Sequence, residues 1–246
     1  MKVRQAANVI ELLEFFAERL RPATAAEIAD GLGWPRSSTF NLVGTLAELG
    51  YLYEPRGRGG LYPTSRWLSI AQAVSAAELL PEAILRLVAQ VAAETGETTL
   101  VGTAAGLHAI VMHVVESEAP IRYFAAEGKR LPIHSCATGW ALLSQLPAAQ
   151  RKALYKRIGF EAYTPQSPLD PVAVEAQIAQ GAARGYFLSD GEFSPHLVGV
   201  SVPLAVDGRQ LAISVAGPQF RCLDRAEAFA GMVRDAIAAT EFQNGR

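Results

Sequence analysis

The chain has little cysteine and no long hydrophobic run. Its 246 residues include only Cys136 and Cys222 as cysteines, and neither belongs to a CxxC spacing, so neither a disulfide framework nor a structural zinc site is indicated. No apolar run approaches the ~18 residues of a transmembrane helix. The amphipathic start carries Glu11 and Glu14 where a signal peptide would be purely apolar. We therefore expect a cytoplasmic protein with reduced thiols and no membrane partner.

An excess of one charge is also missing. The 22 Lys and Arg residues against 24 Asp and Glu give a formal net charge of −2, which carries no signal for nucleic acid over the whole chain. Charge can still be local. One short region, opposed only by Glu48 and Glu54, gathers a small basic patch: Arg36, Arg56, Arg58 and Arg66.

The first part of the chain shows helical spacing. Apolar residues three and four apart predict a helix from about Val3 to Leu20. Thr24 with Glu27 is a capping-box pattern for a short second helix. Pro35 suits the first position of a third helix, for which Gly50 is a natural stop. The expected buried face of this third helix repeats every three residues: Phe40, Val43, Leu46 and Leu49.

After Gly50 come two short aromatic and aliphatic runs, "YLYEP" and "GLYPT", on either side of "RGRGG". Such a pair joined by a glycine-rich loop predicts a β-hairpin. Three helices followed by a hairpin, with a short glycine-containing turn between the second and third helices, are typical of a winged helix-turn-helix. We assign this domain to residues 1–65.

The remainder predicts a linker helix and an α+β domain. Helical spacing over 66–80 is followed by a restart at Pro81, and we assign residues 81–246 to the second domain. Its expected strands are "TTLVGTAA", "HAIVMHVVES", "PIRYFAA", "GYFLS", "LVGVSVPLAV" and "QLAISVAGP", the last two joined by the hairpin signal "DGR". Its expected helices are Pro81–Glu94, Cys136–Leu146, Ala148–Ile158, Pro171–Arg184 and Leu223–Phe242.

Two features favour DNA binding. If the third helix is a recognition helix, its first turn enters the major groove, and the side chains we expect to be exposed there are Arg36, Ser37, Ser38, Thr39 and Asn41. Arg56 and Arg58 at the hairpin tip are placed for a phosphate backbone or a minor groove. The alternatives are that Ser37 or Ser38 only caps a helix that begins later, and that the tip is a solvated turn.

The residues also carry a resemblance. The segment "VIELLEFFAERLRPATAAEIADGLGWPRSSTFNLVGTLAELGYLYEPRGRGGLYPTSRWLSIA" resembles the N-terminal domain of the IclR family of bacterial transcriptional regulators. The segments "GKRLPIHSCATGWALLSQL", "RGYFLSDGEF" and "GVSVPLAVDGRQLAISVAGP" resemble the effector domain of the same family, in order and spacing. One departure is Asn41, because the family commonly has a basic residue at this point of the recognition helix.

The resemblance implies a winged helix domain that binds operator DNA, a linker helix that dimerises, and a GAF-like effector domain that binds a small metabolite. It further implies a homodimer or a dimer of dimers, and a repressor of catabolic genes released by an organic or aromatic acid. The dimer seam could be the face formed by Leu68, Ala71, Val74 and Ala77. We expect no cofactor and no metal.

The effector positions of the family map onto small, hydroxylated or apolar residues. They are Leu131, Ser135, Cys136, Ala137, Thr138, Ser189, Asp190, Gly199, Val200, Ser201, Ser214 and Ala216. In addition, "HSCATG" can present backbone N–H groups at a helix N-terminus to an anion. The alternative for Ser135 to Thr138 is a purely structural loop.

Other functions remain as alternatives. Cys136 near His134 could suggest a thiol nucleophile and its base, but a separation of two residues on one loop is poor geometry and no third orienting group is evident. We therefore expect no enzyme. The runner-up is a metabolite-binding module whose winged domain mediates protein pairing.

Overall fold

The computed structural model describes residues 3–55, 59–77, 80–240 and 242. The chain divides into two compact units, Met1–Leu79 and Leu80–Arg246. We call them the winged unit and the C-terminal unit. No helix in the described ranges is both long enough and apolar enough to cross a membrane.

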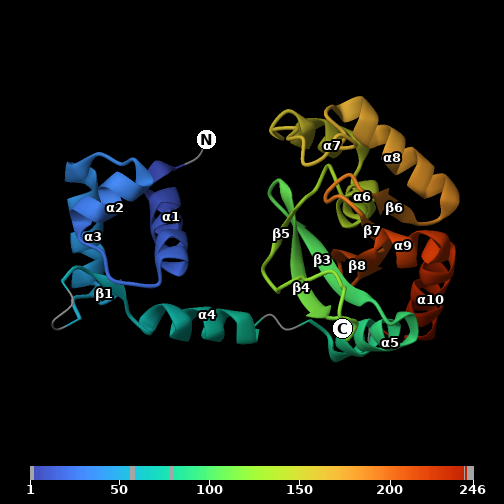
Figure 1. Ribbon diagram of the computed structural model, residues 1–246, viewed down its shortest axis with the longest axis horizontal. Coiled ribbons are helices and arrows are strands. Elements are labelled where there is room, and N and C mark those ends of the chain that lie inside the picture. Colours follow the sequence, from blue (N-terminus) through green and yellow to red (C-terminus); the bar gives the residue numbers. More distant parts are fainter. Residues whose placement is uncertain (1–2, 56–58, 78–79, 241, 243–246) are drawn as a thin grey trace. The chain divides into compact units, whose positions relative to one another are not determined.

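The winged unit contains the predicted helices and hairpin (Figure 1). The elements in chain order are α1 (Arg4–Arg19), α2 (Ala25–Leu32), α3 (Arg36–Glu48), β1 (Leu52–Tyr53), β2 (Tyr62–Pro63) and α4 (Arg66–Ala77). β1 and β2 pair antiparallel. The predicted capping box starts α2, because the Thr24 hydroxyl accepts a hydrogen bond from the Glu27 N–H while the Glu27 carboxylate accepts one from the Thr24 N–H. Leu12, Phe16 and Ile28 pack in the core of this unit.

The buried face of α3 differs from the prediction. Phe40 and Leu49, expected inside, are 57% and 58% exposed, whereas Thr39, expected at the DNA surface, is 0% exposed. Thr39 packs on the same side as Val43 and Leu46, and its hydroxyl donates to the Pro35 carbonyl at 3.0 Å. A helix turns by about 100° per residue, so positions 39, 43 and 46 share a face while positions 40 and 49 point to opposite sides. The prediction that Thr39 contacts DNA is therefore wrong.

The C-terminal unit is built on one antiparallel sheet. Its described strands are β3 (Thr98–Ala105), β4 (His108–Val115), β5 (Arg130–Pro132), β6 (Phe187–Asp190), β7 (Leu197–Val206) and β8 (Arg209–Pro218). They lie in the order β5-β4-β3-β8-β7-β6. The first and last strands of the chain segment, β3 and β8, thus meet at the centre of the sheet.

One expected strand is not a strand. The segment "PIRYFAA" runs as a loop, and β4 pairs instead with the later residues Arg130–Pro132. Side chains satisfy this loop: the Thr98 hydroxyl donates to the Tyr123 carbonyl at 2.7 Å, and Arg221 donates to the Ile121 carbonyl at 2.9 Å. These bonds replace the strand ladder that the apolar pattern suggested.

Helices cover both faces of the sheet (Figure 1). The helical elements in chain order are α5 (Glu82–Thr95), α6 (Ala137–Ser144), α7 (Ala148–Tyr155), α8 (Pro171–Arg184), α9 (Gln219–Cys222), a 3₁₀ turn (Leu223–Arg225) and α10 (Ala226–Ala239). One core joins α5 and α10 to one face of the sheet, and a second core joins α6 and α8 to the other. Strand residues alternate between the two cores, as the period of two requires.

Candidate functional site

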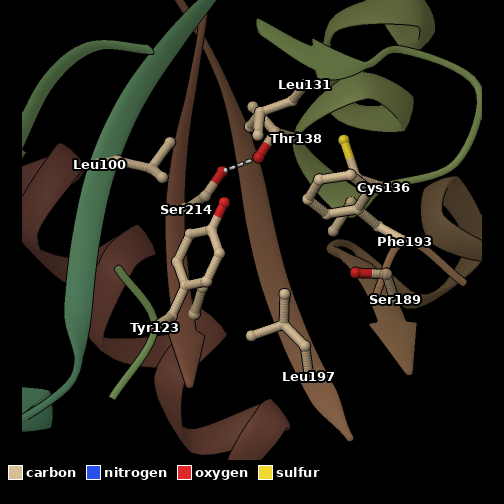
Figure 2. A pocket seen from close by; sticks show the side chains of 12 residues that line it. Leu100, Tyr123, Leu131, Cys136, Thr138, Ser189, Phe193, Leu197 and Ser214 are labelled. Atoms are coloured by element: carbon tan, nitrogen blue, oxygen red, sulfur yellow. Dashed lines mark hydrogen bonds between the residues drawn. The ribbon is translucent and has the colours of Figure 1, made fainter. Parts of the chain in front are cut away.

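A pocket that is partly open to solvent lies in the C-terminal unit between the sheet and the first turn of α6 (Figure 2). Its walls come from five strands (β3, β5, β6, β7 and β8), the start of α6 and two loops. The residues that line it are Leu100, Tyr123, Leu131, Cys136, Ala137, Thr138, Ser189, Phe193, Leu197, Gly199, Ser214 and Ala216. Every lining side chain is apolar, hydroxylated or a thiol.

Small residues on neighbouring strands leave the space open. Gly199 on β7 lies opposite both Ala216 on β8 and Ser189 on β6. A Cβ atom at position 199 would come within 2.8 Å of the Ser189 hydroxyl, which is closer than real contacts. A larger residue at position 199 would therefore fill this wall.

Three hydroxyls form a chain on the sheet side of the pocket. The Thr138 hydroxyl is 2.9 Å from that of Ser214, which is 2.8 Å from that of Ser201 (Figure 2 shows the first pair). All three side chains are at least 95% buried. The Ser201 hydroxyl also lies 3.4 Å from the Ile213 carbonyl, a long and weak contact. Each hydroxyl can act as donor or acceptor, so the direction of the chain can adapt to what meets Thr138.

The helix start at Cys136 does not have the properties of a catalytic thiol. Cys136 is the N-cap of α6, and its Sγ accepts from the Gly139 N–H while its S–H donates to the Pro132 carbonyl. Burial raises the pKa of the Cys136 thiol to about 12. The His134 ring is held elsewhere, with Nε2 3.2 Å from the Glu161 carbonyl, and burial lowers its pKa. This arrangement supplies neither a thiolate nor an adjacent base.

Aromatic rings border the pocket. Figure 2 shows Tyr123 and Phe193 around it, with Leu197 nearby. Burial raises the pKa of the Tyr123 phenol, so this group stays a neutral hydrogen-bond donor or acceptor. The Lys129 ammonium lies 4.9 Å from the centroid of the Tyr123 ring.

The structure brings eight of the twelve predicted effector positions to the pocket wall. They are Leu131, Cys136, Ala137, Thr138, Ser189, Gly199, Ser214 and Ala216. The alternative of a purely structural loop at Ser135 to Thr138 fits Ser135, which does not line the pocket and whose hydroxyl donates to the Glu192 carbonyl at 2.7 Å.

The other predicted positions do not line the pocket, and the reasons differ from one to the next. Val200 lies in the core on the α5 and α10 face. Asp190 follows the pocket residue Ser189, and its carboxylate accepts from Gln219 at 2.8 Å. Ser201 lies on the pocket side but behind Ser214. The prediction that Ser135, Asp190, Val200 and Ser201 line the pocket is therefore wrong.

Four lining residues escaped the sequence reasoning: Leu100, Tyr123, Phe193 and Leu197. Leu100 shares its face with the predicted Ser214, which it opposes across β3 and β8. Finding Leu100 from the sequence requires the register between β3 and β8. Phe193 belongs to the quoted segment "RGYFLSDGEF" and could have been found there. Tyr123 could not, because its segment was expected as a strand.

The winged unit presents the first turn of α3 to its surface. Pro35 is the N-cap and the helix begins at Arg36, so the alternative of a later start capped by Ser37 or Ser38 is not supported. The Ser38 hydroxyl donates back to the Pro35 carbonyl at 2.9 Å. Arg36 is 3.6 Å from Asp30, and both side chains are exposed. The predicted wing residues Arg56 and Arg58 lie outside the described residues.

Comparisons with known proteins match both units. The IclR helix-turn-helix domain matches residues 5–56, and the C-terminal domain of bacterial IclR transcriptional regulators matches residues 71–241. The chain is 27% identical to the transcriptional repressor IclR of Escherichia coli, over 94% of this chain and 86% of the relative. It is 26% identical to the acetate operon repressor of Salmonella typhimurium, over 91% and 83% of the two chains.

Solved structures share the fold. An IclR transcriptional regulator from Alicyclobacillus acidocaldarius superposes with a TM-score of 0.76 at 20% identity, covering 100% of both chains. An IclR homologue from Microbacterium hydrocarbonoxydans, crystallised with 4-hydroxybenzoate, has a TM-score of 0.72 at 20% identity, covering 96% of this chain and 100% of its own. The pairing-module alternative is not favoured, since the curated relatives are named as transcriptional repressors. A winged helix-turn-helix unit followed by a C-terminal α+β unit of matching fold places this chain in the IclR family of DNA-binding bacterial transcriptional regulators.

Proposed function

We propose that the protein represses its target genes and leaves its operator when a small organic acid occupies the pocket. The observation that carries this proposal is the buried hydroxyl chain beside the first turn of α6, because together they can supply several donors to one carboxylate. The first N–H groups of a helix have no partner within the helix and suit an anion. The repressor names of the relatives and the 4-hydroxybenzoate bound to the Microbacterium homologue support the same chemistry.

The hydroxyl chain would act as a relay of donors. A carboxylate at Thr138 accepts its proton, so Thr138 accepts from Ser214 and Ser214 accepts from Ser201. Donors aligned in this way strengthen one another. When Ser201 donates to Ser214, it gives up only its weak 3.4 Å contact with the Ile213 carbonyl. The surrounding Leu131, Phe193 and Leu197 would contact the apolar body of the acid.

The signal would pass between two arrangements of a dimer. A ligand shifts such an equilibrium only as far as it binds one arrangement better than the other. We propose residues 66–80 as the linker between a DNA-binding domain over 1–65 and an effector domain over 81–246. Leu68 and Val74 of α4 are 59% and 66% exposed, which fits a dimer seam, while the side chain of Ala77 lies outside the described part. The working unit is then a homodimer or a dimer of dimers.

Two further expectations follow from this role. A repressor acts where its operator lies, so we expect the protein in the cytoplasm. We also expect no catalytic turnover, since the thiol of Cys136 is buried with a raised pKa and bonded to a backbone carbonyl.

Replacing Ser214 with alanine tests the relay. We expect the acid concentration that releases operator DNA to rise about tenfold, because Thr138 loses the Ser214 donor that aligns and strengthens its own bond to the carboxylate. Ala137→Leu, which fills the pocket, should abolish release. The probes are acetate, benzoate and 4-hydroxybenzoate, titrated into complexes with duplexes that the protein selects from a random pool, with release followed by fluorescence anisotropy.

Ser144→Ala is the matched control, since the Ser144 hydroxyl bonds to the Ala141 carbonyl within its own helix. It should leave release unchanged, and all three variants should retain the DNA affinity of the acid-free protein. Normal release from the Ala137→Leu variant would refute the assignment of the pocket. Failure of every acid to release the wild-type protein would refute an organic acid as effector.

Replacing both Arg56 and Arg58 with alanine tests the wing. If both arginines contact phosphates, DNA affinity should fall to a similar extent for all sequences, and the slope of log affinity against log salt should flatten by about two per winged unit. Binding measured over roughly 50 to 300 mM salt gives this slope. An unchanged affinity and slope would show that the wing arginines are only solvated.

A further inference from the structure

An unusual side chain stands on the exposed face of α3. Phe40 is 57% exposed and takes no part in the core of the winged unit. Nothing among the described residues forms a ring contact with it. The Phe40 side chain is therefore available for a contact outside the winged unit.

Phe40 lies beside a strip of uncharged residues that ends at the exposed Glu48. Ser37, Asn41 and Gly44 lie on the face opposite Thr39, Val43 and Leu46 and are exposed. The Asn41 side-chain amide has no hydrogen-bond partner among the residues that the structure describes. A Cβ atom at Gly44 would meet nothing within 4 Å, so the centre of the strip is open to close approach.

The same helix lacks the side chains that read guanine most often. From Ser37 to Glu48 it contains no Lys or Arg, and Arg36 at its start lies at the edge of the strip beside Asp30. Bidentate contacts from Arg or Lys to the O6 and N7 atoms of guanine are the commonest specific contacts in the major groove. The strip therefore offers different chemistry.

We propose that α3 reads A·T base pairs, with Phe40 packed on the C5-methyl group of a thymine and the Asn41 amide paired with N6 and N7 of an adenine. The methyl group is the apolar feature of the major groove, and Asn matches the donor and acceptor of adenine in a bidentate pair. Both contacts use side chains that are exposed and uncommitted within the protein. The proposal rests on α3 as the recognition helix.

Chemically altered duplexes test each contact separately. The wild-type protein first selects its operator from a random pool, and each half-site should contain both a thymine and an adenine that tolerate no replacement. Deoxyuridine at that thymine removes only the methyl group, and affinity should fall about threefold to fourfold. 7-Deazaadenine at that adenine removes only N7, and affinity should fall about tenfold.

Two protein variants, combined with the two altered bases, complete one double-mutant cycle for each contact. Phe40→Ala should bind the thymine and uracil duplexes equally, and Asn41→Ala should bind the adenine and 7-deazaadenine duplexes equally. Both positions are exposed in a helix where alanine is favourable, so both variants should fold, as circular dichroism would check. Leu49→Ala, another exposed apolar residue at the end of α3, is the control and should keep the full wild-type response to both altered bases.

The outcomes distinguish a failure of the A·T proposal from a failure of α3 as the recognition helix. A selected operator whose contacted pairs are G·C, or a wild-type protein indifferent to both altered bases, would overturn the A·T reading while leaving DNA binding intact. Sensitivity to uracil that persists in Phe40→Ala would overturn the assignment of the methyl contact. A protein that selects no duplex at all would remove α3 as a recognition helix, and the proposal with it.

Discussion

Replacing Trp140 with alanine is expected to lower the free energy of unfolding of the C-terminal unit by about 3–5 kcal/mol. Trp140 is 0% exposed and lies in α6 at the centre of the core shared with α8 and the sheet. Its Nε1–H donates to the His134 carbonyl at 2.8 Å. The substitution therefore opens a large cavity and leaves this buried carbonyl without its donor, which adds to the cost.

Hydrogen exchange of the β8 amides, resolved by mass spectrometry, measures this loss in the intact protein. Trp67→Ala is the matched control, because Trp67 belongs to the winged unit and packs on Tyr51. It should leave exchange in β8 unchanged. A change below about 1 kcal/mol for Trp140→Ala would mean that the core around α6 closes the cavity, contrary to the close packing argued here.

Replacing Arg221 with alanine should cost the same unit about 3–5 kcal/mol, because it strands a buried charge. Glu97 has a side chain only 1% exposed, and Arg221 binds both of its carboxylate oxygens. This pairing raises the pKa of the Arg221 guanidinium. Arg221 also donates to the Ile121 carbonyl in the loop that carries Tyr123, so the substitution loosens one border of the pocket as well.

Urea unfolding measures the cost when it is followed by the fluorescence of Trp140, the only tryptophan of the C-terminal unit, in a background with Trp34→Phe and Trp67→Phe. Arg86→Ala is the control, since its pair with Glu82 is exposed on α5 and should contribute about 0.5 kcal/mol at most. The double variant Glu97→Gln with Arg221→Met should recover part of the loss because no charge is left buried. Equal costs for Arg221→Ala and Arg86→Ala would contradict the burial of the pair.

The third helix shows what periodicity can and cannot predict. Its ends agree with the sequence to within one residue, because capping residues act locally: Pro35, expected as the first helical residue, is the N-cap before Arg36, and the helix ends before Gly50. Its predicted buried face does not agree with the structure. A step of three residues falls about 60° short of a full turn, so the predicted set Phe40, Val43, Leu46 and Leu49 spans half the circumference of the helix. Val43 and Leu46 at the centre of this set are buried. Thr39 occupies this core although its side chain is polar, because its hydroxyl donates to the carbonyl of Pro35, four residues earlier.

The pocket shows a similar division. The family resemblance located most of the wall, and the residues it assigns in β7, β8 and the start of α6 are small, as a cavity beside a sheet requires. Val200 does not line the pocket although its neighbour Gly199 does, because alternate strand residues point to opposite faces. Tyr123 depends on hydrogen bonds from Thr98 and Arg221 to its loop, and such contacts between distant segments leave no local pattern in the sequence.

The strand order also sets the timing of folding during synthesis. Thr98 at the start of β3 pairs with Ala216 near the end of β8, so the centre of the sheet waits for the last hairpin of the chain. The winged unit depends on shorter-range contacts and emerges first, and domains generally fold as units in the order of their synthesis. On the proposed function, a nascent chain acquires the unit that holds DNA before it acquires the pocket through which an acid would release it.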